Sequence, residues 1–196
     1  MEGTNPVNKK LAATLSGGAV LVLALSGCGS SDDSNDKLDA WAKQVCDAVQ
    51  PQAKKIEAAN AAIQKESSEN SPAKDVKKAD VQAFQDMSDA YKAIGAAVQK
   101  AGAPDVENGA KKQKDAVKEL DGIASAYASL KKQVEDLDTK DQAKFADGLK
   151  GIATGLDKLG KTGNDALKAL EEGDVGKAMA KQASCKSASA PAPSAT

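Results

Sequence analysis

The sequence contains no histidine and no arginine, so every basic residue is a lysine. Without histidine there is no Ser-His-Asp or Cys-His catalytic arrangement, no His-containing zinc site and no Glu-x-x-His di-iron motif. Carboxylate pairs such as Glu171 and Glu172 lie where helices are expected to end, and capping and solvation explain them there. The sequence therefore predicts a protein that is not an enzyme and has no catalytic residues, no metal and no cofactor.

An excess of charge of one sign is also missing, since Lys+Arg number 27 and Asp+Glu number 28. Interspersed charges that nearly cancel provide no electrostatic footprint for nucleic acid, and the missing arginine removes the best bidentate ligand of phosphate. No nucleic-acid partner is predicted.

Aromatic residues are scarce, at 3% of the chain. Alanine, leucine, valine and isoleucine must therefore fill most of any core. An alanine-rich core favours helices that pack at close range.

The first 27 residues have the order of features found in a secretory signal. Lys9 and Lys10 supply a positive start, and residues 11–25 form an apolar run that is too short to cross a bilayer comfortably. The run ends in Leu25-Ser26-Gly27-Cys28. An uncleaved N-terminal anchor and an ordinary secreted protein are the alternatives to a cleaved lipoprotein signal.

A branched apolar residue, two small residues and a cysteine resemble the lipobox of bacterial lipoprotein precursors. In that family a diacylglycerol is attached to the cysteine, and the signal is cleaved just before it. The resemblance implies that Cys28 becomes the lipidated N-terminus of a protein at the extracytoplasmic face of the cell membrane, from which part could be released to the exterior. Residues 29–35 are small, polar and acidic, so residues 28–36 are expected to form a flexible tether.

The other two cysteines, Cys46 and Cys185, form an even number in an oxidising compartment. They are predicted to form one disulfide that joins the first helix to the end of the last. The alternative is two buried free thiols. A metal site is less favoured, because two distant cysteines do not make a zinc tetrad.

Apolar residues recur every three or four positions, and no segment shows sustained alternation with period two. The pattern predicts an all-α fold over residues 37–185, an up-and-down antiparallel bundle of four main helices plus a short C-terminal helix. Residues 186–196 read as a disordered Ala/Ser/Pro tail. The expected helices cover residues 36–66, 75 or 80 to 101, about 106–137, 139–170 and 174–184.

Several positions mark the expected ends and breaks of these helices. Asp36 is a plausible N-cap, and Pro51 predicts a kink or break at residues 48–51. Gly102, followed by Pro104, should end the second helix. Thr139 has the spacing of a capping box and is expected to begin the fourth helix.

The fourth helix contains several glycines, which weaken a helix relative to alanine. Gly148, Gly151 and Gly155 are expected to let a neighbouring helix approach closely. The alternative is that the glycines make this helix mobile, with a break near residues 160–163.

Trp41, the only tryptophan, lies five residues before Cys46. We interpret it as a large core residue beside the disulfide, and the alternative is a ligand anchor. Together with the lipobox, the Ala- and Lys-rich helices and the late Cys185, this stretch resembles small secreted lipoproteins of high-GC Gram-positive (actinobacterial) bacteria. That resemblance implies a location and no chemistry.

The sequence leaves three functions open. The first is a non-catalytic binding or interaction module that presents a helical surface to an unknown protein, cell-wall or lipid partner. The second is a carrier of an apolar small molecule or lipid within the bundle, which an apolar cavity would favour. The third is an enzyme, which would require a cleft with converging carboxylates.

Overall fold

The structure, a computed structural model, describes residues 30–67, 71–162 and 165–186. The predicted signal 1–27, Cys28 and the residues after 186 lie outside this part. Over the described ranges the chain is helical and contains no β-strand. The helices are α1 (Ser30–Glu66), α2 (Ala73–Ala101), α3 (Gly109–Glu135), α4 (Gln142–Thr162), α5 (Asp165–Glu171), α6 (Asp174–Lys181) and α7 (Ala183–Lys186).

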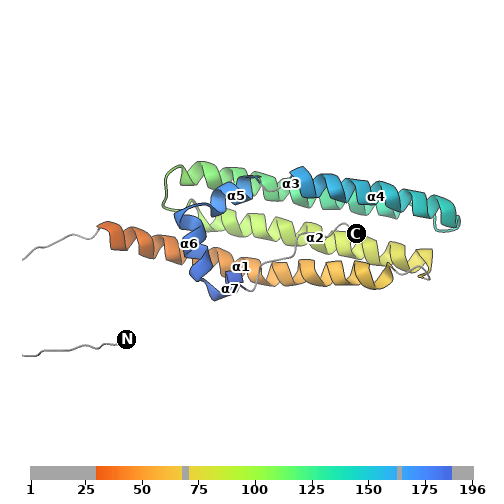
Figure 1. Ribbon diagram of the computed structural model, residues 1–196, viewed down its shortest axis with the longest axis horizontal. Helices are drawn as coiled ribbons and strands as arrows, with labels where there is room; N and C mark the ends of the chain where they lie inside the picture. The colour runs from red at the N-terminus through yellow and green to blue at the C-terminus, as the bar shows by residue number, and fades with distance from the viewer. Residues whose placement is uncertain (1–29, 68–70, 163–164, 187–196) are drawn as a thin grey trace, which may run out of the picture.

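The four long helices α1 to α4 run alternately in opposite directions along one axis (Figure 1). α2 packs extensively against both α1 and α3, and α4 lies mainly against α3. α5 packs on α3, while α6 crosses to α1, where α7 also lies (Figure 1). The predicted all-α bundle of four main helices is confirmed. Within the described residues, α5 falls in the stretch predicted as the end of the fourth helix, and α6 and α7 take the place of the one short C-terminal helix that was predicted.

Two expectations for the first helix need correction. α1 begins at Ser30, so residues 30–36 of the predicted tether are helical and Asp36 is not the N-cap. This segment contains neither glycine nor proline, so no backbone constraint stops the helix there. α1 also continues through Pro51, so of the kink or break expected at residues 48–51 the break is wrong. Pro51 and Asp47 are both exposed, so water can hydrate the Asp47 carbonyl that loses its amide donor.

The connections between α2, α3 and α4 test the predicted ends of these helices. α2 ends at Ala101 as predicted, with Gly102 at φ 79°. α3 begins at Gly109, where an added Cβ would lie 2.1 Å from the Pro104 carbonyl oxygen. The predicted N-cap Thr139 is wrong, because Asp141 Oδ1 accepts the amides of Ala143 and Lys144, each at 3.1 Å. Asp141 directly precedes the helix and presents a carboxylate to its free N–H groups.

Three helix ends are satisfied by side chains from neighbouring helices. Lys77 Nζ donates to the carbonyls of Glu135 and Leu137 at the end of α3. Gln113 Nε2 donates to the Val98 and Gln99 carbonyls at the end of α2. The Glu119 carboxylate accepts the amides of Ala166, at 2.8 Å, and Leu167, at 3.4 Å, in the first turn of α5. These contacts align the helices because free backbone groups at helix ends need partners.

The buried apolar residues form two clusters along the bundle. One cluster, which we call the clasp cluster, lies at the end of the bundle where α6 crosses α1. The other, which we call the distal cluster, lies under α4. Tyr91 and Leu167 pack against both clusters. The clasp cluster consists of Leu38, Trp41, Ala42, Val45, Val98, Ala116, Leu120, Leu170, Val175 and Ala178. The distal cluster consists of Ala59, Ala83, Phe84, Met87, Ile123, Tyr127, Leu130, Val134 and Ile152.

The glycines of α4 differ in what surrounds them. An added Cβ would lie 2.3 Å from Leu137 Cδ2 at Gly148 and 2.8 Å from Leu130 Cδ2 at Gly155. Close packing is therefore confirmed at these two positions. It is wrong for Gly151, which is exposed and has no atom within 4 Å of an added Cβ. α4 ends at Thr162 and α5 begins at Asp165, so the fourth helix predicted over residues 139–170 is divided into two helices.

Candidate functional site

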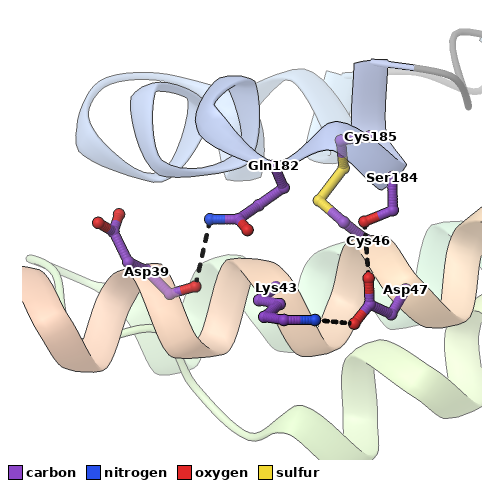
Figure 2. A network of polar contacts seen from close by, with 7 residues as sticks. All are labelled: Asp39, Lys43, Cys46, Asp47, Gln182, Ser184 and Cys185. Carbon is purple, nitrogen blue, oxygen red and sulfur yellow. Dashed lines mark hydrogen bonds and ion pairs between the residues drawn. A yellow bond between two sulfur atoms is a disulfide. The ribbon is translucent and has the colours of Figure 1, made fainter.

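The predicted disulfide forms between α1 and α7. Cys46 and Cys185 are joined with their Cα atoms 4.9 Å apart, across a sequence separation of 139 residues. Cys46 is completely buried, and Cys185 is half-buried. The alternative of two free thiols is therefore wrong. The covalent link holds the C-terminal end of the described chain against the middle of α1 (Figure 2).

Polar contacts surround the disulfide on both sides. Lys181 Nζ donates to Asp39 Oδ1 and Oδ2 at 3.0 and 2.9 Å. Gln182 Nε2 reaches the Asp39 carbonyl oxygen at 3.5 Å, and Ser184 Oγ donates to Asp47 Oδ1 at 2.7 Å (Figure 2). We call the disulfide and these five side chains the C-terminal clasp. Its ion pair is partly exposed, so the pair itself stabilises the fold only slightly.

Asp47 is the charged centre of the clasp on the side of α1. Hydrogen bonds from Lys43 and from Ser184 lower its pKa from the ordinary value. A carboxylate held ionised in this way accepts hydrogen bonds and is a poor proton donor at neutral pH. The clasp therefore holds the C-terminal helices against α1 and provides no pair of groups for acid–base catalysis.

The apolar side of the clasp is formed by α6 and Trp41. Val175 and Ala178 are almost completely buried in the clasp cluster, and Trp41 is only 6% exposed. The indole Nε1–H donates to the Gly102 carbonyl oxygen at 2.8 Å, which ties α1 to the end of α2. The structure thus supports the interpretation of Trp41 as a core residue beside the disulfide, rather than as an exposed ligand anchor.

Trp41→Phe should lower the free energy of unfolding by about 1 to 3 kcal/mol, because the Gly102 carbonyl loses its donor and a smaller ring leaves a void. Urea unfolding followed by far-ultraviolet circular dichroism measures this change. An unchanged unfolding midpoint would contradict the structural role of the indole.

A second feature is an open groove between the C-terminal half of α1 and the N-terminal half of α2, with a cavity volume of about 900 Å³. Ala58 and Ala62 of α1 face it and are exposed. Lys74, Lys78 and Glu66 are among the charged residues along it. We call it the α1–α2 groove. Its small side chains leave room for a polypeptide backbone, and its charges of both signs suit a polar partner.

The most perturbed carboxylate lies in neither feature. Asp80 of α2 is 6% exposed, and burial raises its pKa to about 6. It does not line the α1–α2 groove and does not belong to the clasp. The raised pKa of Asp80 therefore bears on the stability of the fold.

Sequence reasoning identified Cys46, Cys185 and Trp41 correctly, and Cys28 lies outside the described residues. It missed Asp39 and Lys181, whose partnership depends on how α6 crosses α1. The described residues contain no group of three or more side chains suited to hold a metal ion. In the same part of the chain, no helix combines the length and apolarity needed to cross a membrane.

The fold and the clasp define this chain as an all-α helical bundle closed by a disulfide between its first and last helices. Comparisons with protein-family models, with curated proteins and with solved structures found no match.

Proposed function

We propose that this protein is a lipoprotein held at the extracytoplasmic face of the cell membrane by lipid on Cys28, and that it acts there as a non-catalytic interaction module. The single observation that carries the proposal is the Cys46–Cys185 disulfide. Disulfides form and persist in oxidising compartments outside the cytoplasm. Pairing these two cysteines leaves Cys28, at the lipobox, as the cysteine available for acylation.

The geometry of α1 supports a function at a distance from the membrane. α1 begins two residues after Cys28 and has 37 residues. From Ser30 to Ala58, the first residue along the α1–α2 groove, the helix rises about 40 Å at 1.5 Å per residue. A lipid on Cys28 would therefore hold one end of α1 near the membrane, with the groove toward its other end.

The α1–α2 groove is the surface that best suits an interaction module. Exposed alanines let a partner approach the backbone closely, and charges of both signs along it can pair with polar groups. A lipid carrier would instead require an enclosed apolar site. The open, partly charged groove favours a protein or cell-wall partner over the carrier alternative.

Lipidation is tested by mass spectrometry of the protein purified from the membranes of the cells that produce it. We expect an N-terminal peptide that begins at Cys28 and carries a diacylglycerol. A Cys28→Ala variant should lose both the lipid and its membrane association, and it should keep the disulfide. An intact Met1, or an unmodified Cys28 thiol on the wild-type protein, would refute the proposed location.

The interaction role is tested by chemical crosslinking on intact membranes, followed by capture of the protein. Ala62→Glu, in the α1–α2 groove, should reduce the yield of a specific crosslinked partner by about tenfold through steric blockage and an unpaired charge. Ala153→Glu, at an exposed position on α4, is the matched control and should leave the yield unchanged. Equal yields from the two variants would contradict the groove as the interaction surface.

A further inference from the structure

We propose that α4 unfolds and refolds as a separate unit while the rest of the bundle stays folded. The proposal is independent of lipid anchoring and of the α1–α2 groove. α2 is held by extensive packing on both its neighbours, whereas α4 packs mainly on α3 alone and less extensively. Segments with few tertiary contacts open at a lower free energy than the whole protein.

The helix itself is intrinsically weak. α4 contains Gly148, Gly151, Gly155 and Gly160, and each glycine in a helix interior costs up to about 1 kcal/mol relative to alanine. At Gly148 and Gly155 the ends of the Leu137 and Leu130 side chains lie in the space that a Cβ would take. Gly151 and Gly160 have nothing within 4 Å of an added Cβ, so packing does not compensate for their cost.

The two helices on either side of α4 in the chain, α3 and α5, are held in place by contacts that do not involve α4. On its N-terminal side, Lys77 of α2 holds the Glu135 and Leu137 carbonyls at the end of α3. On its C-terminal side, Glu119 of α3 holds the first turn of α5, and the chain beyond is tied to α1 by the disulfide. Loss of α4 therefore breaks none of these contacts.

Unfolding of α4 changes the surface of the distal half of the bundle. Phe145 and Ile152 are buried by the packing of α4, at 3% and 5% exposure. Removing α4 would uncover Leu130 of α3, which lies beside Gly155 and belongs to the distal cluster, while α6 would remain packed in the clasp cluster. Local unfolding of α4 would thus expose apolar surface only at the end of the bundle that contains the distal cluster.

Hydrogen exchange of the purified protein with its disulfide intact, followed by mass spectrometry of peptides, tests this proposal. Peptides from α4 should exchange about tenfold or more faster than those from the buried parts of α2 and α3. Gly151→Ala should slow exchange in α4 by about fivefold, because alanine stabilises the helix at a position with free space. The same variant should leave α2 and α3 unchanged.

Gly122→Ala in α3 is the matched control, since Gly122 is also an exposed helical glycine with nothing within 4 Å of an added Cβ. It should leave the exchange of α4 unchanged. Exchange of α4 in step with α2 and α3 would overturn the proposal. So would a Gly151→Ala variant that slows all helices alike, or one that has no effect on α4.

Discussion

Replacing both clasp cysteines, as Cys46→Ala with Cys185→Ala, should lower the free energy of unfolding by about 4 to 5 kcal/mol. The disulfide closes a loop with a sequence separation of 139 residues. By chain entropy, a loop of that length contributes about 5 kcal/mol by restricting the unfolded chain. Few other effects of a single site on a domain of this size are as large, since a whole domain has a net stability of about 5 to 15 kcal/mol.

Urea unfolding of the variant and of the wild-type protein measures this loss. Reduction of the wild-type protein with a dithiol should reproduce most of it, because reduction removes the crosslink without changing the size of the side chain at the fully buried Cys46. Cys28→Ala is the matched control and should leave the stability unchanged. A loss below about 1 kcal/mol in both the variant and the reduced protein would contradict a stabilising role for the clasp.

Asp80→Asn should stabilise the protein by about 3 kcal/mol at pH 8 and by little at pH 4. Burial raises the pKa of Asp80 from 3.8 to about 6. The folded state therefore binds a proton more tightly than the unfolded state does. The resulting stabilisation is full below about pH 4 and is lost as the pH rises through about 6, where the buried carboxylate ionises. Asparagine carries no charge at either pH, so it avoids this loss.

Thermal or urea unfolding at a series of pH values between 4 and 8 measures the difference between Asp80→Asn and the wild-type protein. Asp89→Asn is the matched control, because Asp89 is an exposed carboxylate on the same helix, and it should change stability by less than about 0.5 kcal/mol at either pH. A gain for Asp80→Asn that is the same at pH 4 and pH 8 would refute the burial of an ionised Asp80 as its cause.

Sequence reasoning succeeded where a local signal was strong. Apolar spacing of three and four predicted the long helices, and Gly102 followed by Pro104 predicted the end of α2. Counting cysteines in a predicted exported chain identified the Cys46–Cys185 pair. Each of these inferences depends on short segments or on residue types.

It failed where two local signals compete or where the surroundings of a residue in the folded chain decide the outcome. Thr139 had the spacing of a cap, but Asp141 occupies that role one residue before α4. Pro51 predicted a kink or a break, yet α1 continues through this exposed position without a break. Close packing was expected at Gly148, Gly151 and Gly155, and only the tertiary structure shows that Gly151 does not take part in it.

The sequence by itself determined the all-helical class and the identity of the crosslinked cysteines, because these follow from periodicity and residue count; the lipobox is a prediction from a local motif. Only the tertiary structure decided that α6 crosses to α1, that Asp80 is buried and that α4 is held mainly by α3. The physical reason is that helix formation is governed by near neighbours along the chain, whereas burial, helix-end partners and cross-helix ion pairs are set by which faces meet when the helices pack.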